Sequence, residues 1–574
     1  MKNPSRETNS GTLVLESPQA VPEQDTETPR YSRRDVLLTM AGVLMVMLLA
    51  SLDQTIVSTA MPHVIADLQG FDRYTWVTTA YLLTSTVMVP IYGKLSDLLG
   101  RKSVFLFGVI IFLIGSAASG ASQSMNQLIA FRAFQGIGAA ALMPIAIAII
   151  GDLFTPRERG KWQGVTGAVF GLSSIVGPAA GGWITENASW RWVFYVNLPV
   201  GIIALLVLIF LMPSLHRRAE QVSIDYLGAA LLVIGTVPLL LGFTWAGSQY
   251  AWLSPQIIGI FAFALVVLTV FGIYEGYLAG HNAQPIIDPR LFKSGVFSLS
   301  VLITTITSMG MFGSIFFLPL FAQGVLGISA TNSGFLLSPM MIALIASSVI
   351  SGQLVSRTGK YKWIAILGMF ITVGGTLLLY RLNVNSVPLD LTLAMIVLGL
   401  GLGFGMALYT IIVQNAWPNK IGEATSALTF FRQIGATVAL AAMGSIMSAA
   451  YVPAFHDALP ASVKHILPAQ VLSFFDNPNI LLSADAQKQM ITKFASFGPQ
   501  GMALYQQILE AVKVGLTQGI HNVFILSTVL MILGLVAVFF LKEIPLRGGK
   551  KQSSTETLEE TVEEVEGISP TMLH

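Results

Sequence analysis

The chain has 574 residues, of which 53% are hydrophobic and only 11% are charged, and its net charge is +2. Soluble domains carry about 25% charged residues, so most of this surface cannot face water and an array of soluble domains is excluded. The small net charge gives no basic surface for nucleic acid, and the lack of cysteine excludes disulfides, thiol catalysis and cysteine-ligated metals.

Fourteen segments are long and apolar enough to cross a membrane as helices, which need about 20 mostly apolar residues. The sequence therefore predicts an all-α polytopic membrane protein. Residues 1–35 are polar, so the first apolar segment is expected to be a retained span rather than a cleaved signal. The predicted spans are 36–61, 75–95, 103–121, 128–151, 162–185, 192–213, 224–246, 255–275, 296–321, 332–356, 362–381, 389–414, 423–449 and 517–541.

Basic residues between the spans predict the orientation, because Lys and Arg collect in cytoplasmic loops. With the N-terminus inside, 23 of the 32 Lys and Arg residues fall in cytoplasmic segments and 7 in external ones. Arg132 and Arg432 lie within spans. We therefore predict that both termini are cytoplasmic and that the protein resides in the plasma membrane.

Two pairs of similar motifs indicate an internal duplication. Gly93–Lys102, at the end of the second span, has a weaker counterpart in Gly352–Lys360. The pair Gly136 and Gly138 is matched by Gly399 and Gly401 at corresponding places. Two related halves of six spans, with two further spans inserted between them, fit this pattern.

The predicted organisation follows from the spans and the duplication. The segment 450–516 is external and is either a folded cap or a loose loop, and the acidic C-terminal tail is expected to be disordered. The predicted parts are a cytoplasmic tail (1–35), an N-terminal six-helix half (36–213), two inserted helices with their linkers (214–290), the first five helices of the C-terminal half (291–449), the external segment (450–516), the last helix (517–541) and a cytoplasmic acidic tail (542–574).

At its motifs the chain resembles the major facilitator superfamily, specifically the branch of 14-span drug:proton antiporters. Leu52–Pro62 looks like that branch's first-helix signature, and Gly93–Lys102 is similar to the loop motif of the whole superfamily. Arg132–Gly138 looks like the fourth-helix motif, and Gly177–Gly182 like the fifth-helix motif of antiporters. One departure is Ser173, where the fifth-helix pattern usually has glycine. The resemblance implies two six-helix halves plus two inserted helices, and transport powered by a proton gradient without a cofactor.

Asp53 is the main candidate for proton coupling. It lies past the middle of the first span, where an ionised carboxylate is costly to hold and burial favours the protonated form. The side chain can exchange a proton as a cavity opens to either side, and in its ionised form it can also bind a cationic substrate. The alternatives are a carboxylate permanently paired with a neighbour or one that faces an outer vestibule.

Arg132 and Gln135 are three residues apart and therefore share one face of the fourth span. Arg132 can tune a neighbouring acid in proton coupling, and Gln135 can contact substrate in a central cavity. Equally, Arg132 can hold backbone carbonyls at a helix end, because no acid lies near it in sequence.

The loop after the second span is a candidate conformational gate. Asp97 and Arg101 are four residues apart across a turn at Gly100, and Gly93 begins the motif. The resemblance implies that this loop stabilises the outward-facing state. The alternative is that its charges only obey the positive-inside rule, which accounts for the lysines but not for Asp97.

A second group of gating candidates lies in the fifth span, where small residues allow close helix contact and proline can kink the helix. This composition suits either a sliding interface between the halves or static close packing. The candidates are Gly177, Pro178, Gly181 and Gly182.

Aromatic and methionine side chains can form an adaptable apolar pocket. The candidates are Tyr81, Met309, Phe312 and Phe316, although most such residues in membrane proteins simply pack or face lipid.

The leading hypothesis is proton-coupled export of hydrophobic, cationic or neutral drugs by a monomer that uses alternating access. Dedicated export of a lipid, siderophore or metabolite is an alternative on the same fold. A membrane enzyme is disfavoured, because the histidines form no H-E-x-x-H pair and no phosphate-binding loop is present. No metal or cofactor is expected.

Overall fold

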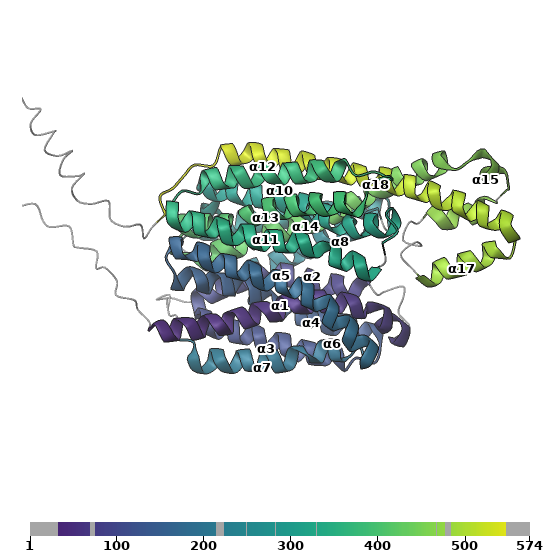
Figure 1. The fold of residues 1–574 in the computed structure, drawn as a ribbon. Coiled ribbons are helices and arrows are strands. Elements are labelled where there is room, and N and C mark those ends of the chain that lie inside the picture. The colour runs from purple at the N-terminus through teal and green to yellow at the C-terminus, as the bar shows by residue number, and fades with distance from the viewer. Residues whose placement is uncertain are drawn as a thin grey trace, which may run out of the picture.

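The computed structural model is a bundle of long helices that lie roughly parallel to one another (Figure 1). Apart from a single isolated bridge between Ala246 and Tyr250, its described residues contain no β-structure. It describes residues 32–68, 75–213, 223–247, 249–281, 283–328, 330–466, 468–476 and 484–546.

The first half contains six predicted spans, the last of which is divided into two helices at Val196. Its helices are α1 (Arg33–Leu68), α2 (Thr75–Leu99), α3 (Arg101–Gly120), α4 (Met125–Leu153), α5 (Pro156–Asn187), α6 (Trp192–Tyr195) and α7 (Asn197–Leu211).

The inserted hairpin and the second half follow. The hairpin is α8 (Tyr226–Trp245) and α9 (Pro255–Gly280), and a short 3-10 helix, η2 (Pro289–Lys293), connects it to the second half. That half contains α10 (Gly295–Gly324), α11 (Ala330–Thr358), α12 (Lys362–Tyr380), α13 (Pro388–Ala416), α14 (Ile421–Ala458) and α18 (Gly498–Phe539).

Thirteen helices in the described residues are long and apolar enough to cross a membrane, and they correspond to thirteen of the fourteen predicted spans. The remaining span is α2, a helix of 25 residues with several Thr and Ser side chains, which lower its mean hydropathy. Its neighbours in the bundle are α4 and α14, so α2 is an integral member of the fold.

The external segment predicted at 450–516 is largely helical where the structure describes it. Helix α14 continues to Ala458 and α18 begins at Gly498, well before the predicted span at 517. Between them lie α15 (Ala461–Ile466), α16 (Ala469–Leu472), the 3-10 helix η3 (Ser473–Asp476) and α17 (Ala484–Ala495). Polar side chains such as Gln506, Glu510 and Lys513 on the early turns of α18 explain why hydropathy missed its start.

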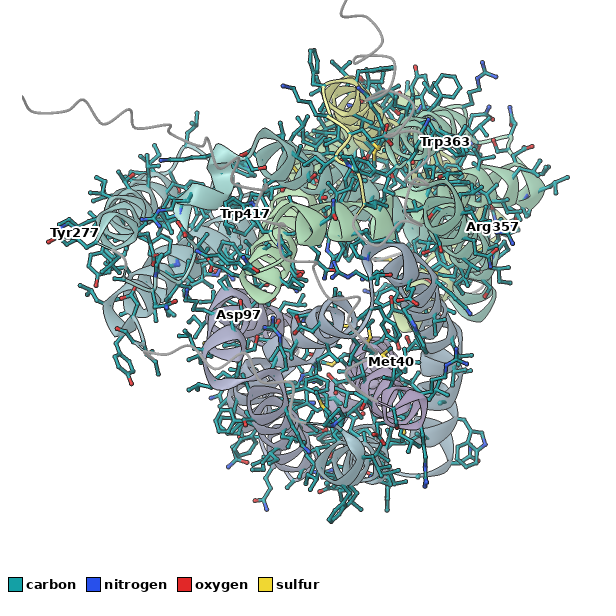
Figure 2. All side chains as sticks on the ribbon, turned by 90° about the vertical axis from the view of Figure 1, so that its left-hand side faces the viewer. Met40, Asp97, Tyr277, Arg357, Trp363 and Trp417 are labelled. Atoms are coloured by element: carbon teal, nitrogen blue, oxygen red, sulfur yellow. The ribbon has the colours of Figure 1, made fainter. Side chains whose placement is uncertain are left out.

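We call the end of the bundle where α1 begins and α18 finishes the termini end, and the end that carries α15 and α17 the cap end (left and right in Figure 1). Seen from the termini end, the first half lies below the second, and the hairpin that carries Tyr277 lies to the left near their junction (Figure 2). Helix α8 contacts α2 of the first half and α14 of the second, while α9 packs mainly on α8.

Candidate functional site

Asp53 lies at the centre of a buried polar cluster inside the first half. Its carboxylate accepts hydrogen bonds from Arg132 Nη1 at 2.8 Å, from Gln135 Nε2 at 2.9 Å and from Asn197 Nδ2 at 2.9 Å. The side chain has no exposed surface, and Arg132 is 2% exposed. Helices α1 and α4 thus supply the two partners of a desolvated ion pair, and α7 supplies a hydrogen bond to it. Removal of either charged partner would leave the other buried without a counterion, which is strongly destabilising.

Arg132 is oriented by further contacts on its own helix and on α2. Its Nη1 also donates to Gln135 Oε1 at 2.8 Å, which follows from the three-residue spacing of the two side chains on α4. The guanidinium lies 4.1 Å from the ring centroid of Tyr81, where the aromatic face stabilises the cation. The guanidinium of Arg132 is therefore held by Asp53, by Gln135 and by the ring of Tyr81.

These contacts bear on alternatives that the sequence left open. Asp53 is paired in this conformation, and its partner Arg132 lies 79 positions away in sequence. Asn197 was missed, because an asparagine near a helix start carries no signal of its own. Tyr81 is 1% exposed, and its ring packs against the guanidinium of Arg132 in this conformation.

A second polar network lies at the termini end, in the motif Gly93–Lys102, which covers the last turns of α2 and the start of α3. Arg101 pairs with Asp97 at 2.5 Å and with Asp152 of α4 at 2.7 Å, and it donates to Ser96 at 2.6 Å. Gly100 makes the turn between α2 and α3 with φ of 91°, a conformation that other residues rarely adopt. The motif thereby presents Asp97 toward the second half.

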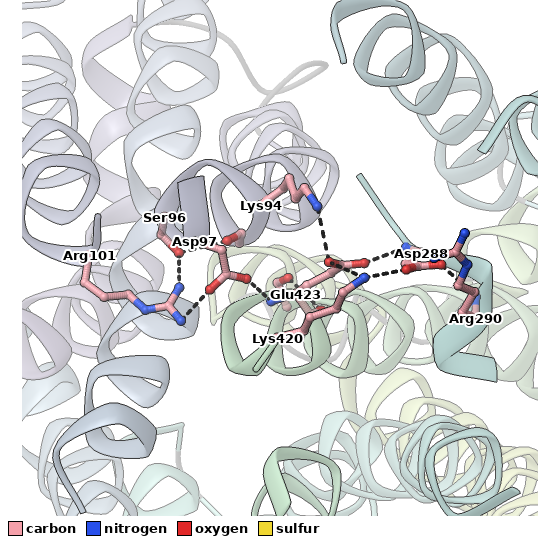
Figure 3. A network of polar contacts seen from close by, with 10 residues as sticks. Lys94, Ser96, Asp97, Arg101, Asp288, Arg290, Lys420 and Glu423 are labelled. Carbon is pink, nitrogen blue, oxygen red and sulfur yellow. Dashed lines mark hydrogen bonds and ion pairs between the residues drawn. The ribbon is translucent and has the colours of Figure 1, made fainter. Parts of the chain in front are cut away.

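The same motif makes direct contact with the start of α14 (Figure 3). Asp97 accepts a hydrogen bond at 2.8 Å from the backbone N–H of Glu423, and Lys94 Nζ lies 3.4 Å from the Glu423 carboxylate. A Cβ atom placed on Gly93 would overlap the side chain of Ser426, so the two helices approach as closely as glycine permits. We call these contacts the latch.

The linker after the inserted hairpin joins the latch (Figure 3). The backbone N–H of Asp288 donates to Glu423 at 2.6 Å, and its carboxylate pairs with Lys420. Burial alone raises the pKa of Asp288, but hydrogen bonds from Lys420 and the backbone of Arg290 outweigh it and hold that pKa below its usual range. The carboxylate is therefore ionised at neutral pH, and Lys420 has an anionic partner.

Helices α5 and α11 form a second contact between the halves. The backbones of Gly160 and Gly352 meet near the termini end, where a Cβ on either would overlap the other's carbonyl. Gly164, Gly167 and Gly171 continue the same face of α5 against α11. The sequence identified Gly352 only as the start of a repeated motif and did not predict that it meets Gly160, because the two glycines are far apart in the chain.

The fifth-helix candidates lie elsewhere on α5. A Cβ on Gly177 would overlap Thr55 of α1, so this glycine allows close packing within the first half rather than between the halves. Gly181 is buried, whereas Gly182 has open space beside it. Pro178 lies within the continuous helix, and its side chain is outside the described set.

A pocket of about 610 Å³ lies toward the cap end between α2, α8, α10 and α14. Phe316 lines it and is 63% exposed. Phe312 is one turn earlier on α10 and 39% exposed, while Met309 is half-buried beside Gly435 of α14. None of the described residues that line the pocket is charged.

Among the described residues, no three His, Asp or Glu side chains gather as the ligands of a metal ion would.

Comparisons with known proteins agree on one family. A family model described as Major Facilitator Superfamily matches residues 43–440. The multidrug transporter protein MdtP of Bacillus subtilis (strain 168) is 41% identical over 92% of this chain and 96% of its own length. Multidrug resistance protein 3 of the same organism is 36% identical over 90% of this chain and 97% of its own length.

Solved structures of transporters share the fold. The human organic anion transporter MFSD10 has a TM-score of 0.54 and 16% identity, over 71% of this chain and 93% of its own. The proton:xylose symporter XylE has a TM-score of 0.53 and 12% identity, over 89% of this chain and 97% of its own. The predicted all-α fold and the assignment as a transporter rather than an enzyme are confirmed, and the protein is a multi-pass membrane protein.

Proposed function

This chain belongs to the major facilitator superfamily, and we propose that it is a proton-driven exporter of hydrophobic compounds in the plasma membrane. The names of its relatives, which include a multidrug transporter and a multidrug resistance protein, support drug efflux. The observation that carries proton coupling is the desolvated Asp53–Arg132 pair inside the first half. In the proposal the working unit is a monomer with both termini in the cytoplasm.

The proposed cycle begins from a state that is closed at the termini end. The latch between α2 and α14 and the contact between Gly160 and Gly352 both lie there. The pocket between α2 and α14 lies toward the other end. With the termini in the cytoplasm, this is an outward-facing conformation, and rocking of the two halves opens the latch to admit substrate from inside.

Proton exchange at Asp53 couples to this rocking through charge. When Asp53 takes up a proton, Arg132 loses its counterion in a site that water does not reach. An uncompensated buried charge costs about 3–5 kcal/mol, which the cluster can avoid only by rearranging α1, α4 and α7. Neutralising one carboxylate therefore supplies a free energy at least as large as the usual coupling between conformations, which is about 1–3 kcal/mol.

The pairing of Asp53 argues against direct binding of a cationic substrate by this side chain. Such binding would need a free carboxylate in the cavity, whereas Asp53 is neutralised by Arg132 and shielded by Gln135 and Asn197. Asp53 belongs to the proton-coupling step of the proposal rather than to direct substrate contact. Phe316 and its neighbours in the pocket remain as the proposed substrate contacts.

The test is an Asp53→Asn variant in everted vesicles with an acidic lumen. Asparagine keeps size and hydrogen bonding but fixes the neutral state, so accumulation of a fluorescent substrate driven by the pH gradient should be abolished while substrate still binds. The matched control is Asp67→Asn on the same helix, because Asp67 is half-exposed and pairs with Arg191 near the cap end. If Asp53→Asn still concentrates substrate, proton coupling lies elsewhere, and Glu423 is the next acid to test.

A further inference from the structure

We propose that the inserted helix α8 forms one wall of the substrate pocket and closes the side opening between the two halves, and that the pocket takes uncharged, mainly apolar molecules with a few hydrogen-bonding groups. This assigns a role to the insertion that distinguishes the chain from a plain twelve-helix arrangement. It rests on the proposed export function, but the binding it invokes needs no proton gradient.

Helices α2 and α14 touch at one end and separate toward the other. Near the termini end the latch brings Gly93 against Ser426 without room for a Cβ atom. Toward the cap end, Thr79 of α2 and Leu440 of α14 line the same pocket, with about 610 Å³ of space between the four helices. The two helices thus form a V whose open side faces the inserted hairpin.

Helix α8 occupies the open side of this V and contacts both of its arms. Trp245 at the end of α8 meets Trp76 of α2 edge to face, with ring centroids 6.2 Å apart. In the turn that follows, Trp252 Nε1 donates to Ser445 Oγ of α14 at 2.7 Å. Gly247, with φ of 74°, packs against the same serine. These contacts hold α8 against the two helices whose separation creates the pocket.

The pocket lining indicates the chemistry of the ligand. Phe243 of α8 and Phe316 of α10 supply aromatic surface, and Thr244 and Thr437 supply hydroxyl groups. Because none of the described lining residues is charged, a ligand with a net charge would lose its hydration without gaining a counterion. Apolar pockets with a few placed polar groups instead favour uncharged molecules.

Two substitutions probe the pocket from opposite sides. Leu240 lines it from α8 and Gly444 from α14. A Cβ on Gly444 meets no other atom within 4 Å, so Gly444→Leu should fold normally and fill space in the pocket. Leu240→Trp enlarges the pocket wall from the inserted helix; because Leu240 is 3% exposed, the thermal stability of this variant is measured alongside binding. The matched controls are Ile234→Trp on α8, where Ile234 is 49% exposed, and Gly272→Leu on α9, where there is also open space.

The assay is equilibrium binding to purified protein in detergent, measured by fluorescence with Nile red as the uncharged probe and ethidium as the cationic one. Leu240→Trp and Gly444→Leu should each weaken Nile red binding by about 5- to 150-fold, which corresponds to the usual cost of overfilling a site, about 1–3 kcal/mol. Binding should not change in the two controls. Wild-type protein should bind ethidium much more weakly than Nile red.

Several outcomes would overturn the proposal. Unchanged Nile red binding in Leu240→Trp, with loss in Gly444→Leu, removes α8 from the binding site. Tighter binding of ethidium than of Nile red refutes the ligand class. If neither variant affects Nile red but both lose co-purifying phospholipid, the pocket holds a lipid chain rather than substrate. Absence of gradient-driven transport in wild-type protein that binds Nile red would instead count against the proposed export mechanism.

Discussion

Replacing Glu423 with glutamine should release the latch. Glu423 is 2% exposed and lies within ion-pair distance of Lys94 and Lys420. The side chain of Lys94 is 8% exposed, so in Glu423→Gln its ammonium group is left desolvated without a carboxylate. The closed conformation loses this pair, whereas the open conformation hydrates both groups and is little affected.

The magnitude follows from the surroundings of each partner. Breaking a buried ion pair by removing one side costs about 3–5 kcal/mol. Glutamine still accepts the hydrogen bond from the backbone of Asp288, and Lys420 is 34% exposed and regains water. We therefore expect Glu423→Gln to destabilise the closed state relative to the open state by about 2–3 kcal/mol. This is roughly a 30- to 150-fold shift of the equilibrium toward the open state.

The absence of native cysteine makes the shift directly measurable. Ser426 is 1% exposed and lies in the latch against Gly93, so a Ser426→Cys side chain should react with a maleimide only when the latch opens. In nanodiscs, where both faces are accessible, the alkylation rate should rise by about the same 30- to 150-fold in Ser426→Cys with Glu423→Gln.

The control is Glu543→Gln in the same Ser426→Cys background. Glu543 is a carboxylate at the same end of the bundle, but it accepts the backbone N–H of Tyr361 at 2.8 Å within the second half. Its removal should leave the alkylation rate unchanged. An equal rate in the two variants would mean that Glu423 does not hold the halves together.

Three further predictions follow from the fold. A reporter at the C-terminus should read as cytoplasmic and one within 450–516 as external; the reverse would overturn the orientation derived from basic residues. Gly160→Ala should impair export at normal expression, because the added methyl group would overlap a backbone carbonyl of α11. The control Gly272→Ala has open space beside it and should transport normally. Equal export rates in the two variants would show that close contact at Gly160 is not required. Tyr361→Phe should lower the free energy of unfolding by about 1 kcal/mol, since it removes the hydroxyl that accepts the half-buried backbone N–H of Ile544 at 2.7 Å. An unchanged denaturation midpoint would contradict this.

The sequence by itself determined the membrane architecture. Each span follows from the transfer of one continuous segment into lipid, which depends on the residues of that segment alone. Thirteen predicted spans therefore match helices that meet the criteria for crossing a membrane, and the fourteenth is present as α2. The motif at Gly93–Lys102 was also recognisable, since its glycines and charges are close together in the chain.

Hydropathy set the ends of helices less well, because a helix can continue outside the membrane. Helix α18 extends 19 residues before its predicted start at 517, through turns that carry polar side chains and lie toward the cap end. Packing on α17 and on the end of α14 accompanies those turns. Apolar content therefore located the membrane part of this helix but not its beginning.

Only the tertiary structure decided which charges meet. Asp53 and Arg132 are 79 residues apart, and Lys94 and Glu423 are 329 apart, so no local pattern linked either pair. The sequence placed both Asp53 and Arg132 within spans, but whether Asp53 was free or paired depended on which faces of α1, α4 and α7 turn toward one another. The physical reason is that lipid acts on each helix separately, whereas the cost of a desolvated charge is set by the partners that packing brings to it.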